Sequence, residues 1–367
     1  MVKVALEATA LLGEKSGVGQ FVMGAVSALN SLPGVELSAF AVTWRRRGEL
    51  AQRLPSGVRP CGLPMPARPL NRMWSSFEFP PVELFLGRVD VVHGTNFVVP
   101  PAILANRVVT VHDLTPLRFP EFCRAEVLVF PRLVKRAMDR GAIVHTPSEF
   151  VRREVIELLG GDPDRVVAVA HGIGEVSEDA LPMQLTGPHP RYLLALGTIE
   201  PRKDYITLLR AFDRVAESEP DLRLVIAGGR GWGFDEFKAE LERTKNRARV
   251  DYVGYVDDRR RIELLRGASV FVYPSIYEGF GFPPLEAMAC QTPVVTTRAG
   301  AIEEVVGDAA ILAEVGDPHG LADAIDSVLN DQPIRSRLIG EGQARVKQFT
   351  WHRAAEGLLS IYRLFNG

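Results

Sequence analysis

The sequence predicts an α/β protein with two Rossmann-like domains and a cleft between them, and three observations support this prediction. Apolar segments of strand length alternate with segments of helical periodicity, an order typical of parallel sheets covered by helices. The chain has 367 residues, which is enough for two complete cores. Residues 173–190 lack periodicity and contain three prolines, so we interpret them as the linker between a first domain, 1–172, and a second, 191–348.

Composition and charge narrow the class of protein. Hydrophobic residues make up 46% and charged residues 24%, which is ordinary for a soluble globular protein. The formal net charge of −2 provides no basic field, which argues against a nucleic-acid partner. Cys61, Cys123 and Cys290 are far apart and lack metal-ligand spacing, so we expect free thiols in a reducing, cytoplasmic compartment. No secretory signal is recognised, and no apolar run approaches the length of a membrane span.

Six segments of the first domain have the composition of buried strands, and three have helical periodicity. Strands are expected at 2–7, 35–43, 90–94, 107–113, 143–148 and 165–172. Helices are expected at 21–32, 126–140 and 148–160, the last with Ser148 as N-cap. The proline-rich stretch 55–72 is expected to be a loop of unclear role.

A glycine-rich turn separates the first expected strand from the first expected helix. It contains Gly13, Gly17 and Gly19 in the segment LLGEKSGVGQF. Such a turn brings backbone N–H groups close to a phosphate or carboxylate in many α/β folds. It also occurs where glycine serves only close packing, so the residues alone leave both interpretations open.

Two histidines stand at the ends of expected strands, His93 in DVVHG and His112 in VHDLTP. Ligands bind at the carboxyl ends of strands in open α/β sheets. A neutral imidazole can donate or accept a hydrogen bond, which suits a polar ligand. A histidine at a strand end is also often a satisfied core residue. We give His93 the lower weight of the two histidines.

Three charged segments of the first domain have simple structural interpretations. The expected helix 126–140 carries Arg132, Lys135, Arg136 and Arg140 beside apolar residues; we favour an ordinary surface helix, and the alternative is a face that meets an anionic membrane. The arginines at 45–47 fit a solvated loop better than a contact with an anionic acceptor or lipid headgroup. The pair Asp162 and Asp164 fits a turn rather than a metal site, so no metal is expected.

The second domain repeats the alternation of strands and helices. Strands are expected at 191–197, 222–229, 250–256, 269–274, 293–297 and 309–315. Helices are expected at 204–217, 234–247, 257–266, 285–290, 321–329 and 334–348, and a terminal helix runs from Thr350 to Leu364 within the segment 349–367.

Cations follow the first strand of the second domain. Arg202 and Lys203 stand near a helix start, where the helix dipole disfavours positive charge. A bound diphosphate would explain them, because guanidinium and ammonium groups pair well with phosphate oxygens. In the next loop, Gly228 and Gly229 fit a phosphate-binding loop and a plain tight turn equally well.

The most informative stretch, residues 269–299, reads as strand, glycine-rich loop, helix and strand. The loop and helix contain Glu278, Gly279, Phe280, Gly281 and Glu286. Backbone N–H groups of the loop and helix start favour an anion, and the two carboxylates accept hydrogen bonds from hydroxyl groups.

Glu278 and Glu286, seven residues apart in EGFGFPPLEAMA, closely resemble the E-x7-E signature of retaining glycosyltransferases of family 4. That family has the GT-B fold and uses nucleotide-sugar donors without a metal. Lys203 matches a lysine of the family, whereas Thr198 stands where an arginine is usual, so Arg202 is expected to supply the missing cation. The helix ends Ala289-Cys290-Gln291, where the family usually has glycine at the last position.

The resemblance implies roles for individual residues, and His93 has the lower weight, as an acceptor-side residue. His112 would bind or polarise the transferred sugar with Asp113 orienting its loop, Glu278 would hold sugar hydroxyls, and Arg202 with Lys203 would stabilise the leaving diphosphate. The residues expected to contact the rest of the donor are Gly17, Val18, Gly19, Gly197, Thr198, Gly229, Tyr255, Val256, Gly279, Phe280, Gly281 and Glu286, the last on the ribose. The terminal helix would cross back onto the first domain.

The resemblance is strongest to bacterial mannosyltransferases of the cell envelope, so GDP-mannose is the expected donor and a glycan or lipid-linked molecule the expected acceptor. No cofactor is expected. UDP-glucose, UDP-N-acetylglucosamine and a non-catalytic sugar-nucleotide-binding protein remain as alternatives; retention of both glutamates argues against the last. A phosphorylase would need a lysine for pyridoxal phosphate in a longer second domain. The expected location is cytoplasmic, peripheral on the inner face of the cell membrane.

Overall fold

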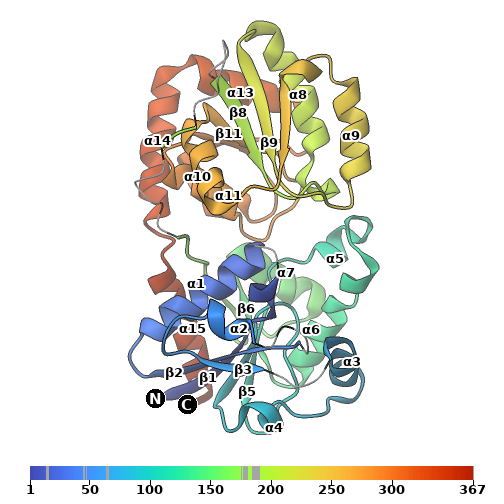
Figure 1. Ribbon diagram of the computed structural model, residues 1–367, viewed down its shortest axis with the longest axis vertical. Helices are drawn as coiled ribbons and strands as arrows, with labels where there is room; N and C mark the ends of the chain where they lie inside the picture. Colours follow the sequence, from blue (N-terminus) through green and yellow to red (C-terminus); the bar gives the residue numbers. More distant parts are fainter. Residues whose placement is uncertain are drawn as a thin grey trace. The chain divides into compact units, whose positions relative to one another are not determined.

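Two compact units make up the chain in the computed structural model, which describes residues 1–13, 16–43, 46, 48–62, 66–174, 176, 181–183 and 191–366 (Figure 1). The first unit comprises Met1–Gly174 and Phe349–Gly367, and the second comprises Glu175–Gln348. Each contains a parallel sheet with helices on both faces, which confirms the predicted α/β class with two Rossmann-like domains.

The first unit has a seven-stranded parallel sheet in the order β3-β2-β1-β4-β5-β6-β7. Its strands are β1 (Val2–Glu7), β2 (Val35–Ala41), β3 (Arg59–Gly62), β4 (Val91–Gly94), β5 (Asn106–Thr110), β6 (Ile143–Thr146) and β7 (Val166–Ala168). Its helices are α1 (Gly17–Ser31), α2 (Leu50–Arg53), α3 (Ala67–Phe77), α4 (Glu83–Leu86), α5 (Thr115–Arg118), α6 (Phe130–Asp139), α7 (Glu149–Leu159) and α15 (Trp351–Arg363). Short 3-10 turns are Thr9–Leu12, Pro120–Phe122, Ala125–Val127 and Leu364–Asn366.

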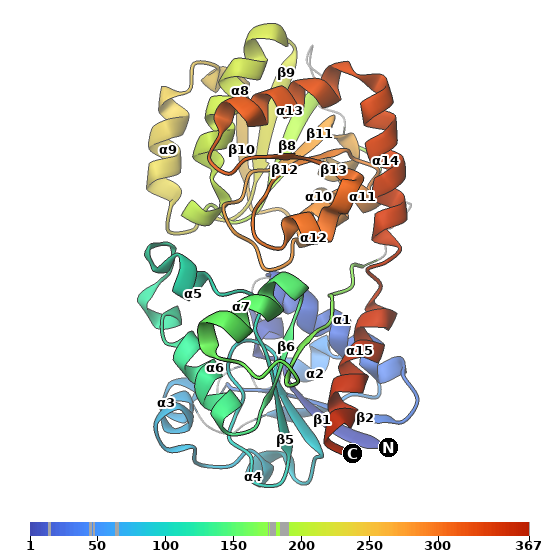
Figure 2. The same cartoon turned by 180° about the vertical axis from the view of Figure 1, so that it is seen from behind.

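Alternating side chains divide this sheet into two packed faces. Val109 and Val144 pack against α6 and α7, and Ala5 and Val92 pack against α3 on the same face. The opposite face is covered by α1 and α15, which contact each other (Figure 2). The strand order reverses between β1 and β4, and this is where an open α/β sheet binds ligands.

The second unit has a six-stranded parallel sheet in the order β10-β9-β8-β11-β12-β13. Its strands are β8 (Arg191–Leu196), β9 (Leu222–Ala227), β10 (Val250–Gly254), β11 (Val270–Tyr273), β12 (Val294–Thr297) and β13 (Ala310–Ala313). Its helices are α8 (Tyr205–Ser218), α9 (Phe234–Arg243), α10 (Asp258–Gly267), α11 (Phe282–Ala289), α12 (Ile302–Val306), α13 (Pro318–Asn330) and α14 (Gln332–Val346). Short 3-10 turns are Pro201–Lys203, Arg247–Arg249 and Gly307–Ala309. Here the strand order reverses between β8 and β11.

The C-terminal helix α15 is packed against α1 and joined to the end of the first unit. A Cβ on Gly24 would lie 2.1 Å from the Trp351 ring, so only glycine permits this close approach. The Ile173 N–H donates to the Phe349 carbonyl at 3.0 Å, and Thr350 caps the helix by accepting from the Arg353 N–H. Figures 1 and 2 both show α1 and α15 side by side.

Three expectations about the first unit need correction. The stretch 55–72 is not a loop, because it contains β3 and the start of α3; the short edge strand and its prolines hide the pattern. The expected helix 126–140 begins only at Phe130 after a 3-10 turn, since Pro131 favours a helix start. Helix α1 begins at Gly17 rather than at residue 21, capped by the Ser16 hydroxyl.

Within the residues that the structure describes, no helix is both long and apolar enough to cross a membrane.

Candidate active site

The second unit brings two cations, a tyrosine and a carboxylate together at the carboxyl ends of β8 and β11. Lys203 follows β8, Tyr273 ends β11, and Glu278 lies in the loop after it. The Lys203 Nζ donates to Glu278 Oε1 at 2.6 Å and to the Tyr273 hydroxyl at 2.5 Å. The Tyr273 hydroxyl donates to the same Glu278 oxygen at 2.9 Å. The cluster therefore lies where the strand order reverses, the expected ligand position.

Arg202 holds the other oxygen of the Glu278 carboxylate. Its Nη1 lies 2.7 Å from Glu278 Oε2 and donates to the Tyr277 carbonyl at 2.7 Å. Its Nη2 donates to Glu200 Oε1 at 2.7 Å. In this structure both Nη atoms thus contact protein oxygens and fix Glu278, whereas a contact of Arg202 with phosphate stays a prediction.

Electrostatics keep the Glu278 carboxylate ionised. Burial alone would raise the pKa of Glu278, but the positive charges of Arg202 and Lys203 outweigh it and lower this pKa to about 2. Burial lowers the pKa of Lys203, against the opposing charge of Glu278. The two side chains are 11% and 9% exposed, so water screens their interaction poorly. Near neutral pH the carboxylate is therefore a hydrogen-bond acceptor.

Close backbone contacts shape the loops around these side chains. Gly197 has a φ of +146°, a conformation that favours glycine, and its carbonyl accepts from the Tyr205 hydroxyl at 2.9 Å. A Cβ on Gly228 would lie 1.8 Å from the Gly197 carbonyl oxygen. The loops after β8 and β9 therefore pass each other at backbone distance, which explains Gly228 as a packing requirement.

The loop that carries Glu278 is fixed through its backbone as well. The Ala301 N–H donates to the Glu278 carbonyl at 2.8 Å, and a Cβ on Gly300 would lie 2.4 Å from that oxygen. Gly281 precedes α11 with a φ of +122°. Gly279 and Phe280, which lie between Glu278 and Gly281 in the chain, are buried. This rigid setting fixes the direction in which the Glu278 carboxylate points.

Glu286 occupies a different setting from Glu278. It lies in α11, its side chain is 11% exposed, and its Oε1 accepts from Arg261 Nη1 of α10 at 2.8 Å. The two signature glutamates thus have separate cationic partners within one unit. The two glutamates could therefore bind different parts of a ligand. The binding of a ribose by Glu286 stays a prediction.

The other residues predicted to contact the nucleotide lie in loops at the carboxyl ends of β8, β9 and β10. Thr198 and Tyr255 are exposed, Val256 is half-buried, and a Cβ on Gly229 would meet no atom within 4 Å. Their side chains or backbones are therefore accessible to a ligand. Their contact with a nucleotide stays a prediction.

The first unit gathers four histidines from four adjacent strand ends around Phe21 of α1. His93, His112, His145 and His171 have ring centroids 4.3 to 6.5 Å from the Phe21 ring. Burial lowers the pKa of all four, and that of His145 falls to about 4. The group is therefore neutral near pH 7.

Of these histidines, His112 is the candidate for ligand contact. It is half-buried, its Nε2 donates to the Thr95 carbonyl at 2.9 Å, and its Nδ1 lies 3.4 Å from His171 Nε2. Asp113 accepts from the Thr115 N–H at 2.9 Å and so orients the loop as expected. A role for His112 toward the sugar stays a prediction.

His93 is a core residue, so the lower-weight prediction of an acceptor-side role is wrong. It is fully buried, its Nδ1 lies 2.7 Å from the Tyr362 hydroxyl, and its Nε2 lies 2.7 Å from Thr110 Oγ1. Thr110 Oγ1 lies 2.9 Å from His145 Nδ1, and His145 Nε2 donates to the Val169 carbonyl at 3.0 Å. Because a carbonyl only accepts, the hydrogen bonds run in one direction, from Tyr362 through His93, Thr110 and His145 to Val169.

The glycine-rich turn and the remaining charged segments fit simple structural roles. Gly17, Val18 and Gly19 form the first turn of α1, and the Gly19 N–H donates to Ser16 Oγ at 3.2 Å. Their contact with donor phosphates stays a prediction. Asp162 accepts from the Asp164 N–H at 3.0 Å, as in the turn that the sequence predicts. Of the arginines at 45–47, Arg46 pairs with Glu49, and the other two lie outside the described residues.

Sequence reasoning missed four residues that the geometry places in or beside the predicted sites. Tyr273 and Arg261 hold the two signature glutamates. His145 and His171 complete the buried group in the first unit. Tyr273 could have been found from its position at a strand end before the glycine-rich loop, whereas the other three need the tertiary structure.

Two parallel α/β units, with a signature glutamate fixed between two cations at the reversal point of the second sheet, define a glycosyltransferase of the GT-B class. Two family models match, Glycosyltransferase Family 4 over residues 15–174 and Glycosyl transferases group 1 over residues 182–345. O-antigen chain mannosyltransferase B of Escherichia coli is 32% identical over 283 residues, which cover 75% of this chain and 74% of that one. The chain belongs to glycosyltransferase family 4, as the E-x7-E resemblance predicts.

A further relative and two solved structures agree with this assignment. Phosphatidyl-myo-inositol mannosyltransferase of Mycobacterium leprae is 33% identical over 222 residues, covering 59% of this chain and 57% of that one. A sucrose-phosphate synthase from Thermosynechococcus elongatus has a TM-score of 0.79 at 18% identity, covering 100% of this chain and 99% of that one. Anabaena HepE in complex with UDP and glucose has a TM-score of 0.76 at 17% identity, and the match covers 98% of this chain and 99% of that one. At such identities the structures show the GT-B fold.

Proposed function

We propose that this glycosyltransferase transfers mannose from GDP-mannose to a glycan or lipid-linked acceptor of the cell envelope, with retention at the anomeric carbon and without a metal. The observation that carries the proposal is the Lys203–Tyr273–Glu278–Arg202 cluster at the reversal point of the second sheet. The mannosyltransferase names of the curated relatives support the choice of sugar. UDP-glucose and UDP-N-acetylglucosamine are the alternative donors.

The cluster suits the departure of a nucleoside diphosphate. Preorganised cations stabilise the negative charge that develops on the leaving phosphate, the task that a divalent metal performs in other enzymes. Lys203 is the stronger candidate, because its ammonium group is held by two side chains at 2.5 and 2.6 Å and has a compact charge. Arg230 is a further candidate on the next loop, exposed and stacked 4.6 Å from the Phe234 ring.

The ionised Glu278 carboxylate is suited to bind the hydroxyl groups of the transferred sugar. Its Oε1 accepts from Lys203 and Tyr273, and its Oε2 contacts Arg202, so a sugar hydroxyl would donate to the remaining lone-pair position on Oε2. In a front-face mechanism the leaving phosphate takes the proton of the acceptor, and Glu278 orients the sugar without forming a bond to it. Glu286, fixed by Arg261, would hold the ribose.

A lipid-linked acceptor would bring the enzyme to the cytoplasmic face of a membrane. The first unit would then make a peripheral contact with anionic lipid. Support comes from the relative named for a phosphatidyl-inositol acceptor and from the basic residues of α6.

The experiment is a donor panel with the purified protein. GDP-mannose, UDP-glucose and UDP-N-acetylglucosamine are compared by release of the nucleoside diphosphate, with and without EDTA. We expect fastest turnover with GDP-mannose, unchanged by EDTA, and a loss of roughly 10²–10³-fold for Lys203→Ala. The anomeric configuration of the product, measured by NMR, tests retention.

Other outcomes would change the proposal in defined ways. Turnover of a UDP-sugar in preference to GDP-mannose would replace the donor. A requirement for Mn²⁺ or Mg²⁺ would show that Lys203 and Arg202 do not stabilise the leaving diphosphate in place of a metal. Binding of nucleotide sugars without turnover, with a full range of acceptors, would favour a non-catalytic binding protein.

A further inference from the structure

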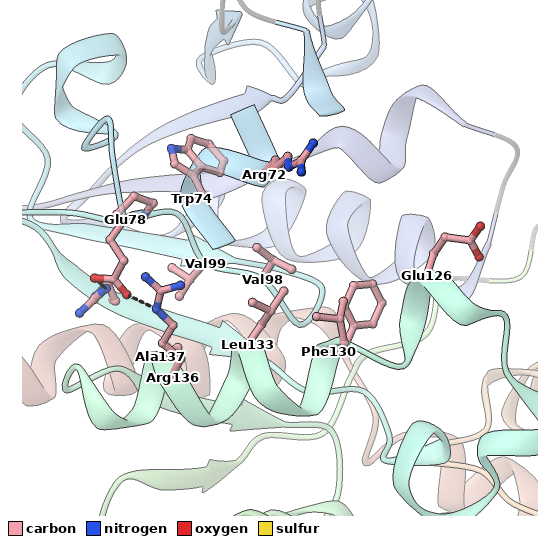
Figure 3. Close-up of a pocket in the computed structure, with 13 residues that line it drawn as sticks. Arg72, Trp74, Glu78, Val98, Val99, Glu126, Phe130, Leu133, Arg136 and Ala137 are labelled. Atoms are coloured by element: carbon pink, nitrogen blue, oxygen red, sulfur yellow. Dashed lines mark ion pairs between the residues drawn. The ribbon is translucent and has the colours of Figure 1, made fainter. Parts of the chain in front are cut away.

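A pocket of about 330 Å³ lies in the first unit between α3, α6 and the loop after β4 (Figure 3). Its lining is mostly apolar and includes the aromatic rings of Trp74 and Phe130. Trp74 is buried and its Nε1 donates to the Pro80 carbonyl at 3.0 Å, so this wall is fixed in place. The volume and the fixed aromatic wall suit one small organic molecule with an aromatic ring.

The charged groups of the lining carry more positive than negative charge. They are three arginines and two glutamates: Arg72, Arg107, Arg136, Glu78 and Glu126. The lining therefore has a formal charge of +1, beside a mostly apolar surface that screens charge poorly. An anionic occupant compensates this charge, whereas a neutral or cationic occupant does not.

The arginines already hold one carboxylate, that of Glu78, at one end of the pocket. It lies 2.9 Å from Arg136, 3.3 Å from Arg140 and 3.9 Å from Arg107, and Figure 3 shows the first of these pairs. Three guanidinium groups around one carboxylate leave a local surplus of two positive charges. Because guanidinium groups pair well with carboxylates, this end of the pocket suits the carboxylate of a ligand.

Phe130 links the pocket to His112, the candidate for contact with the sugar. The Phe130 ring stacks on that of Phe97, with centroids 5.1 Å apart and planes at 10°. The Phe97 ring in turn meets the His112 ring edge-on, with centroids 6.2 Å apart. Phe97 is buried, so one buried ring lies between a wall of the pocket and a residue of the candidate active site.

The backbone of Phe97 is held in a conformation that large side chains rarely adopt. Its φ is +59°, and its N–H donates to the Thr110 carbonyl at 2.9 Å. Such a conformation persists only while the surrounding contacts hold it. The stack with Phe130 is one of these contacts, so a ligand that packs against Phe130 stabilises the arrangement of Phe97 beside His112.

We propose that this pocket binds a small soluble aromatic carboxylate and that the bound ligand raises the rate of sugar transfer. The ligand ring packs against Trp74 and Phe130, and its carboxylate pairs with Arg136. Phe97 then holds His112 more firmly in the position proposed for sugar contact. Binding of the ligand is independent of the proposed function, whereas its effect on transfer rests on that function.

Calorimetric titration of the full chain with 1-naphthoate tests the binding. We expect a one-to-one complex. We also expect about tenfold weaker binding of the neutral 1-naphthalenemethanol, because a neutral hydrogen bond replaces a pair between charged groups. Equal affinity for both compounds, or no binding of 1-naphthoate, would overturn the anion site.

Two variants with matched controls locate the site. Val129→Asp adds a negative charge to the lining and Arg136→Gln removes a positive one, so each should weaken 1-naphthoate binding about tenfold. Leu128→Asp places the same charge on the preceding residue, which is exposed like Val129 but lies outside the lining. Arg132→Gln removes an exposed arginine of α6 outside the lining. Both controls should bind as the unaltered chain does; equal affinities of variant and control would show that 1-naphthoate binds outside this pocket.

Turnover measurements test the effect on transfer. With saturating 1-naphthoate we expect kcat/KM for the preferred donor to rise about fivefold, near the lower end of the usual coupling between two sites. Phe97→Leu removes the stack, so it should still bind 1-naphthoate but lose the rise. Phe122→Leu is the control, because it breaks a similar stack with Phe119 outside the pocket lining. An unchanged or lower kcat/KM, or a rise that persists in Phe97→Leu, would overturn the coupling.

The His112 ring provides a measurement that needs no turnover. In protein labelled with ¹⁵N-histidine, the NMR signals of the His112 ring, assigned with His112→Gln, should shift when 1-naphthoate binds. They should not shift in Phe97→Leu. Bound 1-naphthoate without this shift would overturn the coupling. The shift together with absence of turnover for every donor would contradict the proposed function and support the ligand site with its link to His112.

Discussion

At the scale of single residues, the second unit assigns a position to Tyr273 that the signature does not include. The Tyr273 hydroxyl contacts both Lys203 Nζ and Glu278 Oε1, and Lys203 lies 4.7 Å from the centre of its ring. The Tyr273 hydroxyl thus fixes both Lys203, proposed to stabilise the leaving phosphate, and Glu278, proposed to bind the sugar. Tyr273 is therefore a positioning residue for the proposed transfer.

Tyr273→Phe removes this hydroxyl and keeps the ring. A hydrogen bond to a charged group contributes about 1.5–3 kcal/mol, so we expect kcat/KM to fall roughly 10–100-fold, mainly through kcat. Steady-state kinetics with the preferred donor measure the change. Tyr192→Phe is the matched control, because the Tyr192 hydroxyl is buried in the same unit and donates to the Leu264 carbonyl at 2.6 Å, away from the cluster. Equal kinetic losses in both variants would assign Tyr273 to stability alone.

At the scale of elements, the sequence predicts the strands and helices well where apolar runs are long. β1 coincides with the expected strand 2–7, and α13 and α14 begin at Pro318 and Gln332, within three residues of their expected starts at 321 and 334. Several misses are short elements such as β3, which has four residues and an internal proline and leaves no periodicity to detect. The 11-residue helix α3 was missed as well, because its start lies in the proline-rich stretch that was expected to be a loop. The sequence identifies the two signature glutamates because the loop, the helix and the spacing between them all lie within one short stretch of the chain.

Contacts between distant segments could not be predicted in this way. The pairing of Lys203 with Glu278 spans 75 residues, and that of His93 with Tyr362 spans 269. Such contacts depend on strand order, which periodicity does not encode. The prediction that Arg202 pairs with phosphate also lacked the information that Glu200 and Glu278 approach its guanidinium.

The packing of α15 on α1 depends on one glycine, which gives a prediction at this scale. Gly24→Ala places a methyl group 2.1 Å from the Trp351 ring, so helix or ring must shift. Overpacking of this kind costs about 1–3 kcal/mol, and we expect a lower unfolding midpoint for the variant. Calorimetry or denaturant titration measures it. Gly340→Ala on exposed α14 meets no atom within 4 Å and should raise stability by about 0.4–1 kcal/mol; a similar gain for Gly24→Ala would contradict the packing.

At the scale of the whole molecule, the buried histidines make the stability of the first unit depend on pH. The directed hydrogen bonds from Tyr362 to Val169 connect α15, β4, β5, β6 and the end of β7. They require His93 and His145 to be neutral, since a protonated ring has no acceptor nitrogen. Protonation of either residue must therefore break the chain of hydrogen bonds.

The direction in which stability changes with pH follows from the lowered pKa values of the histidines. A histidine with a pKa near 6.5 when unfolded and about 4 when folded, as for His145, keeps its full stabilising contribution above pH 6.5 and loses it as the pH falls toward 4. The loss for His145 alone is about 3 kcal/mol. The raised pKa of buried Glu7 acts in the opposite sense, because that carboxyl disfavours folding as the pH rises above its unfolded value near 4.5. Three further histidines of the unit have lowered pKa values and act in the same sense as His145.

We therefore expect the free energy of unfolding of the first unit to fall steeply between pH 6.5 and 4, with loss of the α15 contact. Denaturant titrations of the intact protein at pH 8, 7, 6 and 5 measure this slope. His145→Gln removes one titrating group and should flatten the slope, although it lowers stability at pH 8. His352→Gln, on the exposed surface of α15, is the comparison variant, because it removes a histidine outside the buried group. If His145→Gln keeps the slope of the unaltered protein, His145 does not contribute to the acid sensitivity of this unit.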